Sequence, residues 1–374
     1  MTKKSDAPAI RFKRFSDAWE QRKFEEIAVR SSVICSDDTL PRVEYEDIVS
    51  GTGRLNKDIY AKQSIKSGIA FHQGDVLYGK LRPYLQNWLL PTFDGLAVGD
   101  FWVLQPQNAD SSFLYRLIQS RQFDEVANQS TGTKMPRADW KLVSKTVFSI
   151  PSNISEQAAI GTYFTALDSL ITLHQRKFEK LTNVKKSMLE KMFPQNGSSY
   201  PEIRFKGFTD PWEQRKLGEL VDVCSGRDYK HLSEGTIPVY GTGGYMLSVN
   251  DALSYDRDAI GIGRKGTIDR PYILKAPFWT VDTLFYAIPR EKVDLNYAFD
   301  IFQNIDWKKK DESTGVPSLS KTAINDIDVL APKHDEQQII GQFFAAIDNL
   351  ITLHQRELEK LQNIKKSMLE KMFV

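Results

Sequence analysis

Two long segments of the chain place their apolar side chains at the spacing of a helix stripe. In residues 156–193 and again in residues 336–373, the steps along this stripe alternate between four and three residues. The stripe positions are Ile160, Phe164, Leu167, Ile171, His174, Phe178, Leu181, Lys185, Met188 and Met192, and then Ile340, Phe344, Ile347, Ile351, His354, Leu358, Leu361, Lys365, Met368 and Met372. This heptad spacing predicts two long helices, and neither can cover its own apolar stripe.

The simplest partner for each predicted helix is the other copy. Each helix follows a globular region that connects back to the next copy, so we predict an antiparallel coiled coil within one chain. His174 and His354 fall on the seam, where a polar residue would fix the register rather than bind a metal. The last turns of both helices are basic, which leaves open a solvated face, a phosphate track or a docking surface for an acidic partner.

The chain contains the same plan twice. Residues 10–23 and 203–216 are identical at 11 of 14 positions, and residues 156–193 and 336–373 at 27 of 38. Between these landmarks the copies diverge, except for a Ser-Thr-Gly loop followed by proline, at Pro136 and Pro317. A constant frame with different inserts suggests two related tasks on two different targets.

The divergent regions predict mixed, sheet-rich domains of the α+β class. Apolar runs bounded by Gly and Pro predict strands near residues 76–78, 101–104, 237–240, 259–262 and 283–288, and helical spacing covers 111–129 and 296–305. We therefore expect target-facing domains at 1–152 and 195–332, the long helices at 153–194 and 333–374, and a pseudo-twofold repeat overall.

Composition narrows the function classes only slightly. The 374 residues include 50 Lys and Arg against 48 Asp and Glu, for a formal net charge of +2, so any basic surface must be local. Two cysteines support neither a disulfide framework nor a Cys-rich zinc site. No membrane-spanning run and no signal-peptide pattern occur, so the expected location is the cytoplasm, away from membranes.

No catalytic constellation emerges from the sequence. Gly261, Gly263 and Gly266 match a dinucleotide fingerprint, but Pro271 follows where the required helix should grow, which favours a Gly-rich turn. There is no phosphate-binding GxxxxGK[ST] loop, no methyltransferase catalytic loop and no metal-ligand cluster. We therefore expect no catalytic residue, no metal and no cofactor bound by this chain.

Basic residues interleaved with aromatics and glycines mark both divergent regions. Glycine lets backbone approach phosphate, while Lys and Arg neutralise phosphates or form forked hydrogen bonds with guanine. The candidate DNA-binding residues are Lys80, Arg82, Tyr84, Thr133, Lys134 and Arg137 in the first region and Tyr240, Tyr245, Arg264, Lys265, Ser318 and Lys321 in the second.

Several motifs together make the chain resemble the specificity subunits of type I restriction-modification systems. They are the E-Q…I-G…D-x-L-I start of each long helix, its KKSMLEKMF end, the GDVLYGKLRPYL run at 74–85, and GRKG with PFWTVDTL at 263–266 and 277–284. The resemblance covers essentially the whole chain, and each motif alone would be weak.

The resemblance implies a non-catalytic reader of double-stranded DNA. Each divergent region would read one half of a split, asymmetric site. The helices, including their seam, would act as spacer and docking surface for two modification subunits, which use S-adenosylmethionine to methylate adenine N6. Restriction subunits would add ATP- and Mg²⁺-dependent translocation and cleavage. A stand-alone nuclease and a coiled-coil scaffold that binds only proteins remain the alternatives.

Overall fold

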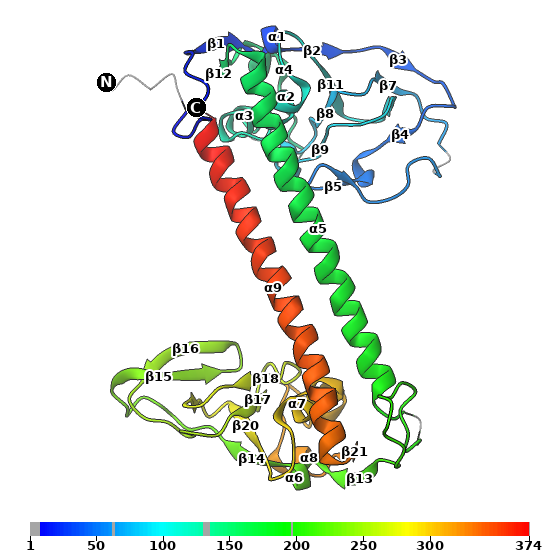
Figure 1. Ribbon diagram of the computed structural model, residues 1–374. Coiled ribbons are helices and arrows are strands. Elements are labelled where there is room, and N and C mark those ends of the chain that lie inside the picture. The colour runs from blue at the N-terminus through cyan, green and yellow to red at the C-terminus, as the bar shows by residue number, and fades with distance from the viewer. Residues whose placement is uncertain (1–7, 62–63, 130–134, 196, 374) are drawn as a thin grey trace. The chain divides into compact units, whose positions relative to one another are not determined.

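The computed structural model describes residues 8–61, 64–129, 135–195 and 197–373, which form two compact units (Figure 1). Unit 1 comprises Met1–His174 and Arg356–Val374, and unit 2 comprises Gln175–Gln355. The long helices α5 (Ile154–Met192) and α9 (His334–Met372) each have residues in both units. Each unit therefore holds one globular region, the start of one long helix and the end of the other.

The globular region of unit 1 combines short strands with short helices. Its strands are β1 (Trp19–Lys23), β2 (Ala28–Ser31), β3 (Ile34–Cys35), β4 (Arg42–Val43), β5 (Ile48–Val49), β6 (Arg54–Leu55), β7 (Gly68–Phe71), β8 (Val76–Gly79), β9 (Trp88–Leu89), β10 (Gly95–Ala97), β11 (Phe101–Pro106) and β12 (Val147–Pro151). Its helices are α1 (Phe24–Ile27), η1 (Tyr45–Asp47), η2 (Pro83–Leu85), α2 (Ser111–Leu117), α3 (Arg121–Ala127) and α4 (Trp140–Lys145). The sheet orders are β2-β11-β8-β9, β3-β7-β10-β4, β1-β12 and β5-β6.

Unit 2 follows a similar plan with different strands. Its strands are β13 (Glu213–Lys216), β14 (Val221–Ser225), β15 (Glu234–Gly241), β16 (Gly244–Val249), β17 (Ala259–Gly263), β18 (Tyr272–Leu274), β19 (Trp279–Thr280), β20 (Leu284–Pro289) and β21 (Asp328–Ala331). Its helices are α6 (Leu217–Leu220), α7 (Leu295–Asn304), η3 (Trp307–Lys310) and α8 (Lys321–Asn325). The sheet orders are β14-β20-β17-β18, β16-β15-β19 and β13-β21.

The principal sheets of the two units share one topology. The order β2-β11-β8-β9 in unit 1 matches β14-β20-β17-β18 in unit 2, with antiparallel neighbours throughout. The second sheets differ, although each contains one parallel pair, β4 with β10 and β15 with β19. The mixed α/β class and the internal repeat predicted from the sequence are confirmed, and the predicted strands are present. The helical spacing at 111–129 corresponds to two helices, α2 and α3, because the Ser120 hydroxyl caps the start of the second.

The start of each long helix belongs to the core of its own globular region. Ile160, Phe164 and Leu167 are buried with side chains of α2 and α3 in unit 1, and Ile340 and Phe344 are buried with α7 in unit 2. The ends of the other helix pack against the same cores, through Met372 in unit 1 and Leu189 and Met192 in unit 2. In each unit the start of one long helix thus lies against the end of the other, and the globular region covers part of the predicted seam.

The remaining seam positions are less buried. Ile351 and Leu361 pack at the margins of the cores, and Ile171, His174, Leu181 and His354 are half-buried. Lys185 and Lys365, the two lysines at stripe positions, form ion pairs with Asp348 and Asp168. In the part of the chain that the structure describes, no helix is both long and apolar enough to cross a membrane, and no group of His, Cys, Asp or Glu could hold a metal.

Buried charge differs between the two units at matched places. In unit 1, Asp168 forms ion pairs with both Arg116 and Lys365, each with an N···O distance of 2.7 Å. In unit 2, Lys185 pairs with Asp348, and the carboxyl of Asp300 occupies the position in α7 that corresponds to Arg116 in α2. The Oδ2 atom of Asp300 is buried without a hydrogen-bond partner among the described residues.

Replacing Asp300 with Asn is expected to stabilise the protein, and more at high pH than at low pH. Burial raises the pKa of Asp300 well above its usual value, although the Lys185 ammonium opposes the rise. The unfolded chain loses this proton near pH 4, so wild-type stability falls as the pH rises from there towards the folded pKa. Asp300→Asn removes that loss. Thermal unfolding of the wild type and the variant at about pH 5 and about pH 8 measures the change in stability at each pH. An equal increase in stability at both pH values, or the same increase from Asp306→Asn at an exposed position, would contradict the prediction.

Candidate nucleic-acid interface

In unit 1, the end of strand β8 is joined to the segment that follows the Ser-Thr-Gly loop. The amide of Arg82 donates to the carbonyl of Pro136 at 2.7 Å, and the amide of Ala138 donates to the carbonyl of Lys80 at 2.8 Å. Leu81 and Arg137 form a β-bridge between these bonds. Three candidate residues, Lys80, Arg82 and Arg137, are therefore brought together on one backbone frame.

Asp100 holds two of these cations. Its carboxylate lies 3.4 Å from the Lys80 ammonium and 3.0 Å from the Arg137 guanidinium. The Asp100 carbonyl accepts from the amide of Lys80 at 2.9 Å and from the Tyr45 hydroxyl at 2.6 Å. Burial alone would raise the pKa of Asp100, but the Arg137 and Lys80 side chains outweigh it and hold the pKa below its usual value. Asp100 is thus ionised and fixes the direction of both side chains.

In unit 2, the end of strand β17 is joined to the matching segment in the same way. The amide of Gly266 donates to the carbonyl of Pro317 at 2.9 Å, and the amide of Leu319 donates to the carbonyl of Arg264 at 3.0 Å. Lys265 and Ser318 form the β-bridge between them. Lys321 follows one residue after Ser320, whose hydroxyl caps helix α8. The structure therefore brings together Arg264, Lys265 and Ser318, and Lys321 lies three residues after Ser318 at the start of α8.

These two frames correspond bond for bond. Lys80 matches Arg264, because the Lys80 amide donates to the carbonyl of Asp100 and the Arg264 amide donates to the carbonyl of Thr283. Arg82 matches Gly266, and both have a positive φ, 48° and 87°. That left-handed conformation is unfavourable for Arg, and glycine adopts it readily. We name these two places reader frame 1 (residues 80–82, 100 and 136–138) and reader frame 2 (residues 264–266, 283 and 317–319).

The other candidates of the first region vary in position. Tyr84 is 56% exposed in η2, directly after reader frame 1. The Arg82 side chain is half-buried, and its Nε atom has no hydrogen-bond partner among the described residues. Thr133 and Lys134 lie outside the described residues. Tyr84 thus offers an exposed ring beside the frame, whereas Arg82 contributes to it through its backbone.

Tyr240 and Tyr245 lie outside reader frame 2. They belong to the β15–β16 hairpin, which Figure 1 shows as a pair of long strands beside the principal sheet of unit 2. Tyr240 is half-buried and packs against Tyr272, with ring centroids 6.1 Å apart. Tyr245 is 63% exposed, and its hydroxyl lies 3.2 Å from that of Ser248. Tyr245 is therefore the accessible member of the pair, and Tyr240 supports the hairpin.

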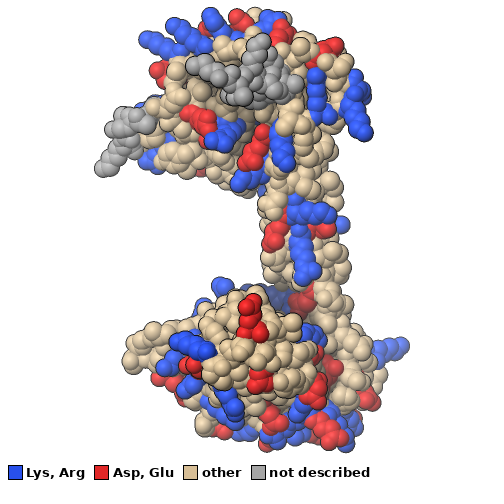
Figure 2. Space-filling view, turned by 90° about the vertical axis from the view of Figure 1, so that its left-hand side faces the viewer, with Lys and Arg blue, Asp and Glu red and all other residues tan. Residues whose placement is uncertain are grey.

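On the face that Figure 2 shows, the charged side chains of the described residues do not form a continuous basic surface. Figure 2 shows Lys and Arg interspersed with Asp and Glu over the visible face of each globular region. This agrees with the formal net charge of +2. Affinity for a polyanion would therefore have to come from local cation sets such as the two reader frames.

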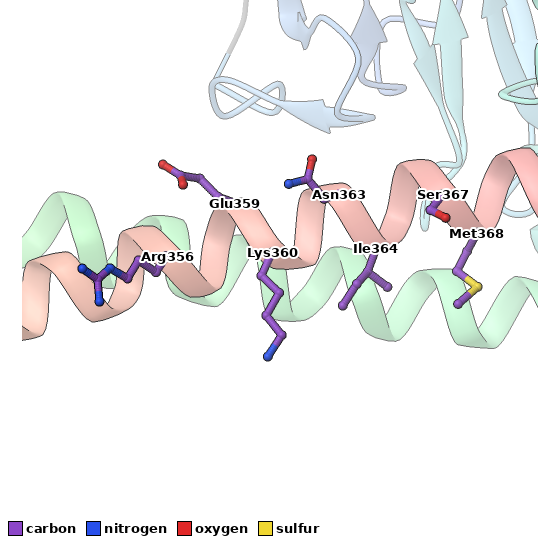
Figure 3. Close-up of a pocket in the computed structure, with 7 residues that line it drawn as sticks. All are labelled: Arg356, Glu359, Lys360, Asn363, Ile364, Ser367 and Met368. Carbon is purple, nitrogen blue, oxygen red and sulfur yellow. The ribbon is translucent and has the colours of Figure 1, made fainter. Parts of the chain in front are cut away.

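A second kind of surface lies on the long helices. Arg356, Glu359, Lys360, Asn363, Ile364, Ser367 and Met368 line an open groove of about 530 Å³ along α9 (Figure 3). Figure 3 shows Glu359, Asn363 and Ser367 on one side of the helix and Ile364 and Met368 on the other. A groove of about 490 Å³ on α5 is lined by Arg176, Glu179, Lys180, Asn183, Val184 and Ser187, at the matching positions of the repeat. We call these the twin grooves.

The repeated short motifs were recognisable from the sequence, but their structural role was not. Arg11 of the first short motif forms two hydrogen bonds, of 2.6 and 2.7 Å, with buried Glu156 at the start of α5. Arg204 does the same with Glu336 in unit 2, at 2.7 and 2.8 Å. We call each pair, with the tryptophan that also donates to its glutamate, a clamp. The twin grooves were also missed, although their exposed residues are retained between the copies.

Comparisons with known proteins agree with this architecture. The family model described as "Type I restriction modification DNA specificity domain" matches residues 30–183 and again residues 209–363. The chain is 23% identical over 338 residues to the type I restriction enzyme MjaVIII specificity subunit of Methanocaldococcus jannaschii, covering 76% of this chain and 77% of that protein.

Solved structures show the same fold. The type I restriction-modification S subunit of M. genitalium aligns with a TM-score of 0.73 and 16% identity, covering 98% of this chain and 99% of the other. A chain from a structure concerned with complex assembly and conformational transition of the type I R-M system aligns with a TM-score of 0.52 and 16% identity, over 94% and 96%. With the family model matching most of its length, the chain belongs to the type I restriction-modification DNA specificity family and contains the family's domain twice.

Proposed function

We propose that this chain is the DNA-recognition subunit of a type I restriction-modification complex, in which each globular region reads one half of a bipartite, asymmetric site. The observation that carries the proposal is the pair of reader frames. They share one set of backbone hydrogen bonds, yet they carry different side chains at matched positions. Similar backbones with different side chains suit two half-sites of different sequence.

The long helices would serve as an antiparallel coiled-coil spacer and as the docking surface for modification subunits. Each helix has residues in both units, so it can transmit a fixed half-site separation, as dimeric DNA readers do. The twin grooves keep the same residues at five matched positions, namely Arg176, Glu179, Lys180, Asn183 and Ser187 and their counterparts 180 residues later, and of these only Ser367 is half-buried rather than exposed. Packing of the cores does not require these surface residues to be identical in the two helices. Their identity therefore supports docking of two copies of the same partner, one on each groove.

In this proposal the chain itself is not catalytic. The partner modification subunits would bind S-adenosylmethionine and methylate adenine N6, and restriction subunits would use ATP and Mg²⁺. The chain would contribute the choice of sequence.

Exchange of one globular region tests the two-reader proposal. The chain is combined with its modification subunits and S-adenosylmethionine, and methylated adenines are mapped on random-sequence DNA. Replacing residues 20–150 with those of another family member is expected to change one half of the methylated sequence and leave the other half intact. A change in both halves or in neither would overturn the proposal. DNA cleavage by the chain alone would instead indicate a nuclease, and an assembled complex without salt-dependent DNA affinity would indicate a protein scaffold.

Replacing Arg137 and replacing Lys321 should have different effects. Arg137 is held in one direction by Asp100, as expected for a base-reading side chain, so Arg137→Ala should cost about 1–2 kcal/mol on the cognate duplex and relax one position of the first half-site. Lys321 is exposed at the start of a helix, so Lys321→Ala should weaken binding to every sequence and flatten the salt slope by about one unit. Binding titrations of the assembled complex at several salt concentrations measure both; equal behaviour of the two variants would contradict this assignment.

A further inference from the structure

The two reader frames differ most at one matched position, Asp100 in unit 1 and Thr283 in unit 2. Asp100 directly precedes strand β11, and Thr283 directly precedes strand β20. The carbonyl of each accepts a hydrogen bond from the amide of the cationic residue that follows the neighbouring strand, Lys80 after β8 and Arg264 after β17. Backbone geometry therefore places Asp100 and Thr283 equivalently. One side chain is an ionised carboxylate and the other is a neutral hydroxyl, so the cations beside them are held differently.

In reader frame 1 the cations are partly neutralised and fixed. Lys80 and Arg137 both reach the Asp100 carboxylate, so the three side chains together carry one positive charge. The carboxylate is only 29% exposed. A guanidinium has five N–H donors and an ammonium has three, so both cations keep free donors while bonded to Asp100. Those donors can meet base acceptors in one geometry without leaving the carboxylate.

In reader frame 2 the cations have no carboxylate partner among the described residues. Arg264 lies over the ring of Phe285, 5.7 Å from its centroid, and its Nη1 atom is 3.5 Å from the Asp282 carbonyl. Lys265 is exposed. Asp311, an acid that bonds within this frame, accepts from the amides of Ser313 and Ser318 and from the Ser313 hydroxyl. Two uncompensated positive charges are thus available to phosphates.

We propose that Asp100 is a specificity-determining residue that makes the cations of reader frame 1 selective for base sequence, whereas Thr283 leaves the cations of reader frame 2 to supply phosphate affinity, so that other side chains of unit 2 read the second half-site. This inference rests on the proposed DNA-reading function. On a wrong sequence the free donors of Lys80 and Arg137 meet no base acceptor, and turning these side chains toward phosphates would break their contacts with Asp100 and strand a partly buried carboxylate beside the DNA backbone. An unpaired, partly buried charge destabilises the complex with a wrong sequence, and this penalty is a source of specificity. Frame 2 lacks this penalty, so its cations bind any phosphate within reach.

Reciprocal substitutions in the assembled complex test this division of roles. Asp100→Thr gives frame 1 the residue of frame 2, and Thr283→Asp does the reverse. Affinity is measured for the cognate duplex and for duplexes with one changed base in either half-site, between about 50 and about 200 mM salt. Glu125→Gln, which removes the same charge from the exposed Arg121–Glu125 pair of unit 1, serves as control.

Asp100→Thr is expected to lower discrimination in the first half-site by about tenfold, to leave the second half-site unchanged, and to steepen the salt slope by about one unit. Thr283→Asp should weaken binding to all duplexes and flatten the slope. Asp100→Asn, which keeps the side-chain shape, should reproduce Asp100→Thr. Unchanged discrimination, an equal loss in both half-sites, or the same effects from Glu125→Gln would overturn the inference. If the wild-type complex does not discriminate a bipartite site at all, the proposed function itself fails.

Discussion

Replacing Arg204 with Met is expected to lower the free energy of unfolding by about 3–5 kcal/mol, as seen when one partner of a buried ion pair is removed. The Glu336 carboxylate is 2% exposed and accepts two hydrogen bonds from the Arg204 guanidinium and a weaker one, of 3.4 Å, from the Trp212 indole. Without Arg204 this carboxylate stays buried with its charge uncompensated. The same substitution at Arg11 should have the same effect through Glu156, which is fully buried. Urea unfolding followed by circular dichroism measures both.

Two controls separate the clamp from general surface charge. Arg215→Met removes a guanidinium of the same region whose ion pair with Glu219 is exposed, and should cost less than about 1 kcal/mol. Adding Glu336→Gln to Arg204→Met removes the stranded charge and should recover part of the lost stability. If Arg204→Met and Arg215→Met destabilise equally, the buried pair does not hold the short motif to its helix.

The clamp explains why the ends of the two copies remain alike while their middles diverge. Arg11 and Glu156 lie 145 residues apart, and Arg204 and Glu336 lie 132 apart, yet each pair joins the beginning of a globular region to the start of the helix that follows it. In each copy, the arginine and the tryptophan of the short motif are constrained by their hydrogen bonds to the buried glutamate. The variable strands between them are free to change the side chains of the reader frames.

Local patterns were sufficient to predict the elements that depend on local physics. The heptad spacing predicted both 39-residue helices, because apolar residues that recur at steps of three and four positions all lie on one face of a helix. The proline after Gly266 correctly excluded a nucleotide-binding helix, since a β-strand and a Gly turn occupy that place. The repeated proline also located both reader frames, because Pro136 and Pro317 supply the matching carbonyls.

Contacts between distant residues were not predictable in the same way. Nothing near Asp100 in the sequence indicates that it meets Arg137, because a strand pairing and a loop closure bring them together. Tyr240 looked like a surface aromatic in a Gly-rich run, but the hairpin folds it against Tyr272.

Replacing Gly341 with Ala is expected to lower the free energy of unfolding by about 2–3 kcal/mol, although Ala normally favours a helix by about 1 kcal/mol over Gly. Helix α9 crosses the start of α7 at this glycine. An added Cβ would lie 2.7 Å from the amide of Tyr297 and against the carboxylate of Asp294. That amide and that carboxylate form the cap of α7, at 2.9 Å. The new methyl group would therefore separate the helices or break the cap, which is worth about 1 kcal/mol.

Unit 1 offers a matched test of the same junction. An added Cβ at Gly161 would overlap the side chain of Ser112, beside the Asp110 cap of α2, so Gly161→Ala should also destabilise the fold. Here the obstacle is mainly a side chain, and Ser112→Gly should restore part of the loss. No such rescue is expected at Gly341, because the backbone amide of Tyr297 also lies only 2.7 Å from the added Cβ. Urea unfolding of Gly341→Ala, of Gly161→Ala and of Gly161→Ala combined with Ser112→Gly measures these effects. If either alanine variant is more stable than the wild type, the long helices do not pack closely against the caps of α2 and α7.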